Sequence, residues 1–421
     1  MSASEQPPKP PTPKRRWYQY SLRSLMIFGT LCAFACSWFA VKRQQAETQR
    51  QAVEALAFSD DRLCLVKYDY EVDDKGHWIR CESPPAPDWL LKLLGRDFFA
   101  TVVEVSNSEM SAEGNGFRGN NIREQIGKLT RLRKLRLYRS NATDADLLHL
   151  HDLAQLRELS LFNAQITDAG LRQLTAFPQL QVLAVGSREN DITDRGLETL
   201  KRLTHLRELR LTCRRVSDAG MRRIGRLGHL ETLEICTDGI IDAGLESLRP
   251  LRNLKSLRAG IVTDTGLRTI SELAGLEELA LDVTKVSDSG LERLSALPRL
   301  RNLDFWGRSA IRVGSLRSLP RLEELSISSA TDANLDGLAE LRGLRHLVIK
   351  GDFTDAGMRN LESLKRLHTV MLGSPAVTGA AMKHLKPLTE LERITLRCRS
   401  LTLNDWAELH ATFPKCKIWA Y

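Results

Sequence analysis

The stretch "LRELSLFNAQITDAGLRQLTAFPQ", residues 156–179, decides the fold because the whole unit recurs along the chain. Its opening places leucines at positions 156, 159 and 161, so the spacing shortens from three to two, as it does where a β-strand begins. Leu171, Leu174 and Phe177 then recur every three residues, which is typical of one face of a helix. Each unit therefore predicts one short strand followed by one short helix.

Twelve full copies of the strand pattern LxxLxL follow one another, and "FPKCKI" (413–418) adds a shortened copy. A strand and a helix of this size cannot bury their apolar sides alone, but stacked copies can. Parallel strands lie about 4.8 Å apart, whereas helices are wider, so the stack must bend with the strands inside. We expect an α/β solenoid, with a curved parallel sheet inside and helices outside. The copies begin at residues 132, 156, 180, 206, 230, 254, 276, 300, 322, 344, 367 and 391.

Together with "(T/S)DxGLxxLxxL", as in "ITDAGLRQL" (166–174), this pattern resembles the leucine-rich-repeat family, whose unit opens LxxLxL and forms one strand. The resemblance covers residues 100–418. It is closest to ribonuclease-inhibitor-like and F-box-associated repeats, which also occur in many bacterial proteins, and here it suggests a bacterial membrane-anchored form. Those relatives commonly carry Asn or Cys a few residues after the strand, where the side chains stack into a ladder. Here that place holds Ala164, Arg214, Asp238 and Thr284, so the backbone polar groups of this turn must find other hydrogen-bond partners.

An aspartate recurs where the helix of each unit begins. A Thr, Ser or Asp there accepts hydrogen bonds from the first turn, worth about 1 kcal/mol, and a negative charge suits the helix dipole. Because Ile241 replaces the usual Thr or Ser while Asp242 remains, we expect the carboxylate to be the cap. One carboxylate per unit cannot supply the several oxygens that Ca²⁺ needs, so no metal or cofactor is expected. The expected caps are Asp144, Asp168, Asp194, Asp218, Asp242, Asp264, Asp288, Asp332 and Asp355.

A glycine usually stands two residues after this aspartate, as Gly170 does, but Asp146 and Asn334 replace it in two units. We expect that a small residue is needed against the neighbouring unit. The unit "RSAIRVGSL" (308–316) lacks the Asp–Gly signature, which could mark a bend, a contact site or simple drift.

Residues 24–41 contain no charge and would span about 27 Å as a helix, close to the apolar thickness of a bilayer. Arg23 and Lys42 bracket this run, and a modest excess of Lys and Arg before it favours a cytoplasmic N-terminus. We therefore expect a single-pass signal anchor, with the array outside the membrane (periplasmic or extracytoplasmic). Cleavage of this segment, or lipidation at Cys36 in "AFAC" (33–36), is the alternative.

The segment before the array should cap its open end. It should contain strands within residues 63–72, 77–83 and 98–105, and a helix at 89–95 capped by Asp88. The expected organisation is a disordered Pro-rich basic tail (1–20), a transmembrane helix (21–42), a polar helical stalk (43–60), a capping region (61–131) and the repeat array with its C-terminal cap (132–421).

The net charge of +9 does not indicate nucleic-acid binding. Residues 1–50 hold eight Lys or Arg and two Glu, a net charge of +6 that leaves +3 for the other 371 residues. No nucleic-acid partner is expected. The eight cysteines form no CxxC pair, and Cys64 and Cys81 could pair or remain isolated thiols.

In LxxLxL the leucines point into the core, so the intervening residues face the concave surface. Exposed Tyr, Trp and Arg are enriched at protein–protein hot spots. Three arginines and two aromatic residues in one row would suit an acidic peptide or a glycan, although any inner face contains some of each. The candidate binding residues are Arg136, Tyr138, Phe162, Arg210, Arg258 and Trp306, and Asp304, Lys350 and Arg397 share this surface.

These patterns favour a non-catalytic, membrane-anchored leucine-rich-repeat protein that binds a protein or another macromolecule through its concave face. One alternative, implied by the repeat type, is a cytosolic ubiquitin-ligase-type substrate adaptor, and another is a secreted or lipidated binding protein. An enzyme with its site at residues 60–100 is a third class. Its acid–base candidates, which match no catalytic spacing, are Asp60, Asp61, Asp73, Asp74 and His77.

Overall fold

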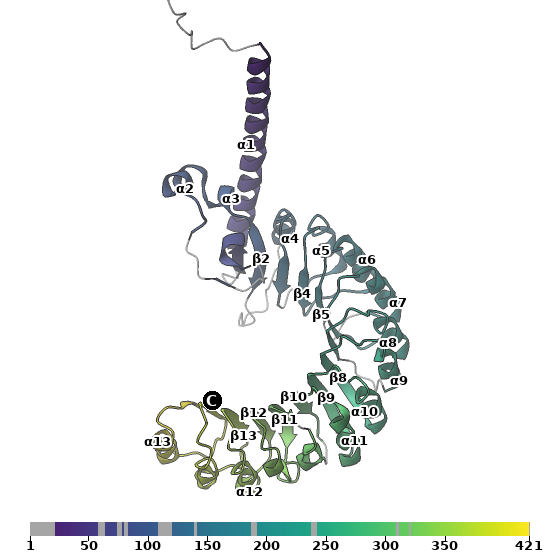
Figure 1. Cartoon of the computed structure of the whole chain (residues 1–421), viewed down its shortest axis with the longest axis vertical. Helices are drawn as coiled ribbons and strands as arrows, with labels where there is room; N and C mark the ends of the chain where they lie inside the picture. The colour runs from purple at the N-terminus through teal and green to yellow at the C-terminus, as the bar shows by residue number, and fades with distance from the viewer. Residues whose placement is uncertain are drawn as a thin grey trace, which may run out of the picture.

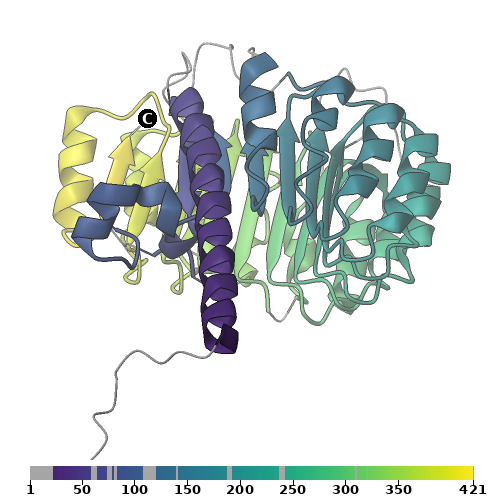
Figure 2. The same cartoon turned by 90° about the horizontal axis from the view of Figure 1, so that it is seen from above.

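Parallel strands line the inner side of a curved arc and helices cover its outer side, as Figures 1 and 2 show. The α/β solenoid expected from the sequence is therefore confirmed. The computed structural model describes residues 22–57, 64–73, 78–79, 83–107, 120–138, 141–186, 192–236, 242–308, 311–319 and 321–420. The expected tail (1–20), Cys81, Asp60, Asp61, Asp74, His77, Asp238 and Ile241 lie outside the described residues.

One sheet runs through the whole arc, and its fifteen described strands follow the order of the chain. Each strand from β2 onward pairs in parallel with the next, whereas β1 is antiparallel to β2. The strands are β1 (Cys64–Tyr68), β2 (Val102–Asn107), β3 (Lys134–Leu137), β4 (Glu158–Phe162), β5 (Val182–Gly186), β6 (Glu208–Thr212), β7 (Thr232–Cys236), β8 (Ser256–Thr263), β9 (Glu278–Lys285), β10 (Asn302–Trp306), β11 (Glu324–Ala330), β12 (His346–Gly351), β13 (Thr369–Gly373), β14 (Arg393–Leu396) and β15 (Lys417–Ala420).

Short helices return the chain from each strand to the next. The α-helices are α1 (Leu22–Ala57), α2 (Asp88–Leu94), α3 (Arg96–Phe99), α4 (Asn120–Gly127), α5 (Asp144–Leu148), α6 (Asp168–Gln173), α7 (Asp194–Leu197), α8 (Asp218–Ile224), α9 (Asp242–Leu245), α10 (Asp264–Ile270), α11 (Asp288–Glu292), α12 (Asp355–Met358) and α13 (Leu403–Thr412). Single 3₁₀ turns are η1 (Asp69–Glu71), η2 (Leu174–Ala176), η3 (Glu198–Arg202), η4 (Glu246–Leu248), η5 (Arg293–Ala296), η6 (Val313–Leu316), η7 (Leu338–Glu340), η8 (Arg359–Leu361) and η9 (Gly379–His384).

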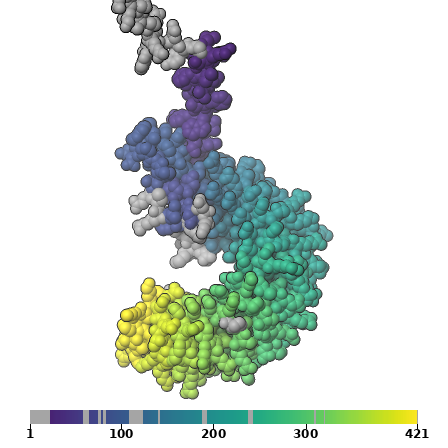
Figure 3. All heavy atoms as spheres, viewed as in Figure 1, coloured from purple at the N-terminus to yellow at the C-terminus, as the bar shows by residue number. Residues whose placement is uncertain are grey.

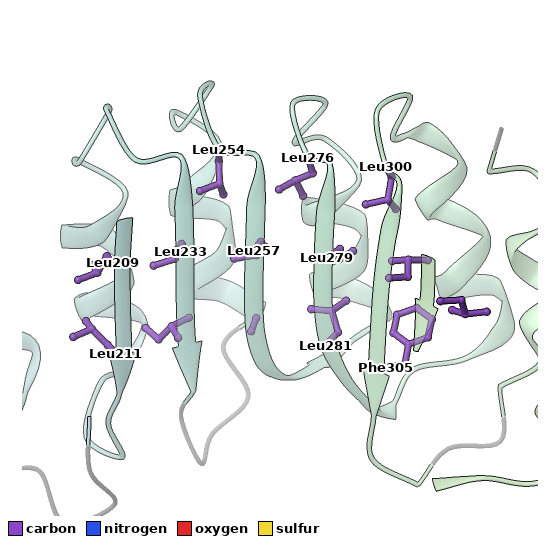
Figure 4. Close-up of a cluster of buried hydrophobic side chains, with 14 of the residues drawn as sticks. Leu209, Leu211, Leu233, Leu254, Leu257, Leu276, Leu279, Leu281, Leu300 and Phe305 are labelled. Carbon is purple, nitrogen blue, oxygen red and sulfur yellow. The ribbon is translucent and has the colours of Figure 1, made fainter. Parts of the chain in front are cut away.

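The core is a continuous stack of aliphatic side chains between the sheet and the helices. Figure 4 shows part of it, where Leu209, Leu233, Leu257 and Leu279 occupy the same position on four successive strands. Each of these leucines is buried. Burying one leucine contributes about 1.5–3 kcal/mol, so the repeated column supplies most of the stability of the array.

The turns at Ala164 and Cys213 are stabilised by backbone hydrogen bonds to a neighbouring unit, whereas the N–H of Thr284 donates to the side chain of Asp282 at 2.9 Å. Ala164 is fully buried there, and the N–H of Gln165 donates to the carbonyl of Ala142 in the preceding unit at 2.6 Å. The N–H of Cys213 donates to the carbonyl of Cys236 at 3.1 Å in a later unit.

Helix α1 includes both the apolar run and most of the polar stretch that follows it. Large apolar side chains such as Phe28, Phe34 and Trp38 are exposed on its first half, which projects beyond the arc in Figure 1. By length and composition this helix could span a membrane. Its last turns bury Ala52 and Leu56 in the core of the cap, so they do not form an isolated stalk.

Two expectations for the cap were wrong. Phe98 and Phe99 lie in α3 and β2 begins at Val102, because Phe98 packs against aromatic rings of α1, a contact distant in sequence. Asp88 is the first residue of α2 rather than its cap, since Pro87 holds the capping position and makes no side-chain bond. Near residues 77–83, Trp78 forms an isolated antiparallel bridge to Val72.

Candidate functional site

The strand register places the candidate binding residues on the concave face in two groups. Arg136 and Arg210 occupy the same row, with Arg258 two strands beyond Arg210. Ser160 and Ala184 lie between the first two arginines in this row, so the row is interrupted by small residues. Figure 3 shows the arc open on one side, with this face lining the space between its two ends. One group lies on β3 and β4, and the other on β6 to β10.

The first group combines an aromatic stack with a charge network. The rings of Tyr138 and Phe162 stack with centroids 4.8 Å apart, and the backbone of Tyr138 is held by both amide atoms of Asn107. Arg136 forms a bidentate pair with Glu158, in which Nη2 lies 2.8 Å from Oε2. The guanidinium of Arg136 is therefore engaged by a neighbouring strand.

Glu104 extends this network toward the cap. Its side chain is 3% exposed, and its Oε1 lies 2.9 Å from Lys67 Nζ and 3.5 Å from Arg136 Nη1. The hydrogen bond to Glu158 raises the pKa of Arg136, with a smaller contribution from the nearby charge of Glu104. A buried carboxylate needs such partners, so Arg136 stabilises the sheet here.

The second group surrounds a hollow of about 470 Å³ in the middle of the concave face. Arg210 Nε lies 2.7 Å from Glu208 Oε1 and 3.8 Å from Glu234 Oε2. Arg258 lies between two acids, 3.7 Å from Glu234 Oε1 and 3.4 Å from Asp304 Oδ2. Both arginines line the hollow with their charges already paired.

Trp306 joins this group through Arg258. The guanidinium carbon of Arg258 lies 4.6 Å from the centroid of the Trp306 ring, within the range of a cation–π contact. This contact and the two ion pairs are partly exposed, so each contributes at most about 1 kcal/mol. A ligand could therefore rearrange them at low cost.

The charge of the hollow is opposite to the sequence-based expectation. Two arginines line it, against the four carboxylates of Glu234, Glu278, Asp304 and Glu324. Glu278 has no ion pair among the described residues, and Glu324 has a contact of 3.9 Å with His346. An acidic peptide would meet repulsion here, whereas a cationic group would be attracted.

Asp304 was expected on this face, whereas Glu234, Glu278 and Glu324 were missed, although a repeat-by-repeat alignment contained the signal for Glu278 and Glu324. Glu158, Glu208, Glu278 and Glu324 all follow the second residue of their LxxLxL motif, as in "LRELRL" and "LEELAL". In-register parallel strands bring residues at equal motif positions into one row. The arginines and aromatic residues of this face do not by themselves reveal the row of carboxylates beside them.

The aspartate column does not cap the helices in the way the sequence suggested. The hydroxyl of Thr167 accepts a hydrogen bond from the N–H of Ala169, and Thr193 does the same for Arg195. The cap is therefore the hydroxyl residue, and Asp168 is the first residue of the helix. A negative charge at this position still suits the helix dipole.

Where the described residues include the partner, the carboxylate instead bonds to the next unit. Asp168 accepts the backbone N–H of Thr193 at 2.8 Å and its hydroxyl at 2.7 Å. The Thr or Ser of the following unit is held in the same way by Asp144, Asp194, Asp242, Asp264, Asp332 and Asp355. Asp288 accepts the N–H of Arg312. For Asp218 the corresponding residue of the next unit, Ile241, lies outside the described residues.

The glycine of the motif makes room for this bond. A Cβ at Gly196 would overlap the carboxylate of Asp168, and the same holds at Gly170 with Asp144. The requirement for a small residue is thus confirmed. Where the preceding unit has no such aspartate, the glycine position carries the acceptor itself: Asp146 binds Thr143, Asn334 binds Thr331 and Asp405 binds Thr402.

Comparison with known proteins agrees with this repeat architecture. A family profile described as a leucine-rich repeat region matches residues 155–355. Among solved structures, an internalin from Listeria monocytogenes is 20% identical, with 65% of this chain and 82% of that chain covered and a TM-score of 0.41. A leucine-rich-repeat protein of Leptospira interrogans is 17% identical, with 74% and 95% covered and a TM-score of 0.32. No curated protein matches the chain. The central part of this chain therefore contains a leucine-rich repeat region, and the same stacked strand–helix units continue on both sides of it.

Proposed function

We propose that this protein is a non-catalytic, membrane-anchored binding protein that recognises a protein partner through its concave face. Leucine-rich-repeat proteins generally mediate protein–protein interactions. The observation that carries the proposal is the hollow on β6 to β12, where polar and charged side chains converge on a rigid sheet. The apolar half of α1 supplies the anchor, with the N-terminus inside and the array outside the membrane.

The charge of the hollow indicates the chemistry of the partner. Four carboxylates and two paired arginines would favour a segment that carries lysine or arginine. Such a segment could bond to Glu278 without breaking any ion pair of the described residues, and its side chains could pack on Trp306. Tyr138 and Phe162 offer a second, apolar contact on the same face.

The test is binding of a lysine-rich and a glutamate-rich peptide of equal length to the full chain in detergent. We expect the lysine-rich peptide to bind more tightly, with an affinity that falls as salt rises. The double variant Glu278→Gln with Glu324→Gln should weaken this binding, because it removes two carboxylates of the hollow and leaves both arginines paired. The matched control, Glu246→Gln with Glu292→Gln, removes two exposed carboxylates near the outer helices.

Equal loss in both double variants would show that net charge, and not the hollow, attracts the peptide. Tighter binding of the glutamate-rich peptide would overturn the assigned charge preference. Membrane anchoring is tested separately by carbonate extraction, since release of the chain as soluble protein would contradict it.

A further inference from the structure

The capping region packs against α1 at the level where the apolar run of this helix ends. Trp38 and Phe39, near the end of this run, pack on Phe98 of α3 with ring centroids 6.5 and 5.3 Å apart. In a chain anchored through α1, aromatic residues at this level would lie at the membrane–water interface. Helix α3 and its neighbours would therefore face the bilayer surface.

Helix α2 presents apolar side chains on this part of the cap. Trp89 and Leu93 are one helical turn apart and are 65% and 70% exposed. Lys92 is exposed beside them. An exposed Trp–Leu face next to a basic residue is typical of a helix that lies in the membrane interface.

A basic groove lies beside α1 as well. It has a volume of about 370 Å³ and is lined by Val41, Lys42, Thr48, Lys128 and Arg131, among others. Lys42 and Arg131 form no ion pair among the described residues, and Lys128 lies 3.1 Å from Glu124. Figures 1 and 2 place α2 and α3 on one side of α1 and α4, which precedes Lys128, on the other.

The one carboxylate that lines this groove is already bonded within the cap. Asp97 Oδ1 accepts hydrogen bonds from Gln49 Nε2 at 2.7 Å and from the Tyr68 hydroxyl at 3.2 Å. Burial, followed by the charge of Asp97, raises the pKa of Tyr68, so this hydroxyl stays protonated and keeps donating. Three cations therefore face an opening whose acid is engaged.

Gln49 also fixes the angle between α1 and the cap. Its side chain donates to the Ala100 carbonyl at 3.0 Å and accepts the Val102 N–H at 3.0 Å, in addition to its bond to Asp97. Because Val102 starts β2, the helix is bonded directly to the sheet. The groove and the α2 face thus keep a constant position relative to the end of the apolar run.

We propose that these two surfaces contact the bilayer on either side of α1: the α2 face (Trp89, Leu93) enters the interface and the basic groove (Lys42, Lys128, Arg131) binds the headgroup of an anionic phospholipid. This inference rests on the proposed membrane anchor. Three cations suit a phosphate-bearing headgroup, and the adjacent apolar run of α1 suits its acyl chains. The arc would then stand on the membrane at a set orientation.

The α2 face is tested with the full chain in phosphatidylcholine vesicles that carry brominated acyl chains, which quench tryptophan fluorescence. Trp38→Phe, Trp89→Phe and Trp406→Phe report the quenching of each residue by difference. We expect Trp38 and Trp89 to be quenched and Trp406, in α13 at the far end of the arc, to be unaffected. Quenching of Trp38 without Trp89 would overturn the α2 contact and leave the anchor standing, whereas quenching of neither would overturn both.

The groove is tested by the lipid retained after extraction from vesicles of phosphatidylcholine and phosphatidylglycerol in equal amounts. We expect the retained lipid to be enriched in phosphatidylglycerol, and Lys128→Gln with Arg131→Gln to reduce this enrichment about fivefold per cation removed. The matched control is Arg226→Gln with Arg299→Gln, which occupy the same repeat positions in units distant from α1. An unchanged ratio of retained phosphatidylglycerol to phosphatidylcholine in Lys128→Gln with Arg131→Gln would overturn the proposed binding of lipid in the groove. Loss of a detergent-stable dimer in Trp89→Phe would instead assign the α2 face to a second copy of the chain.

Discussion

The carboxylate of Asp168 accepts both the backbone N–H and the hydroxyl of Thr193, a residue 25 positions later in the next repeat. Thr193 in turn accepts the N–H of Arg195 and so starts its own helix. One aspartate therefore connects two units at the point where the second unit leaves its turn. The bond pair is charge-assisted and partly buried, which makes it stronger than an ordinary surface contact.

Asp168→Ala should destabilise the array around the second and third repeats. It leaves the Thr193 N–H without its acceptor, and hydrogen bonds to charged groups contribute about 1.5–3 kcal/mol. Urea unfolding measures the loss, and amide exchange should show it at residues 193–197. Asp168→Asn should lose less, because Asn334 binds the N–H and hydroxyl of Thr331 through one amide oxygen. The exposed Asp352→Ala is the control, and equal effects in all three variants would contradict this role.

The loss in Asp168→Ala should be rescued by adding Gly196→Asp. The new carboxylate would bind Thr193 from within its own unit, as Asp146 binds Thr143 at 2.6 and 2.9 Å. Gly196→Asp alone should destabilise the protein, because its side chain would overlap Asp168. A double-mutant cycle in urea measures this coupling, which we expect to be at least about 1 kcal/mol. Additive losses would show that the two positions do not share one acceptor site.

Gln49→Ala should loosen α1 from the sheet without unfolding the repeats. The variant removes three hydrogen bonds that connect the helix to Asp97, Ala100 and Val102, each worth about 1 kcal/mol. Amide exchange at residues 100–104 should accelerate, while exchange at β6 to β9 stays as in the parent chain. Gln51→Ala, whose side chain bonds only to Glu47 among the described residues, is the matched control. Unchanged protection of the Val102 amide from exchange would contradict this role of Gln49.

The stability of the array should fall at alkaline pH through Cys213. Burial raises the pKa of this thiol to about 12, with a smaller contribution from Cys236. Below about pH 9 the thiol is protonated in both folded and unfolded chains. Between about pH 9 and 12 the unfolded chain loses this proton first, so the free energy of unfolding decreases as pH rises. Urea midpoints across this range should fall less steeply in Cys213→Ala, and rapid alkylation of native Cys213 at neutral pH would contradict its burial.

The arc could be predicted because its evidence is local and repeated. Leu156, Leu159 and Leu161 all lie in the core, as their spacing indicated. The role of Asp168 could not be predicted from its own unit, since its partner lies in the following one. The pairing of Arg258 with Glu234 and Asp304 was hidden for the same reason, because strand register brings together residues far apart in sequence. Helix α3 was not predicted because Phe98 packs on Trp38 and Phe39 of α1, which are distant in sequence.

The exchange between an aspartate in one unit and a glycine in the next makes the order of the units significant. Asn334 serves Thr331 because Val313 stands where the preceding unit would otherwise carry an aspartate. Deleting the unit of residues 300–321 would bring Asp288 before Thr331 while Asn334 still occupied the space the carboxylate needs. Units that carry both the aspartate and the glycine could therefore be removed or duplicated freely, whereas a unit with Asp or Asn at the glycine position requires a predecessor without the aspartate.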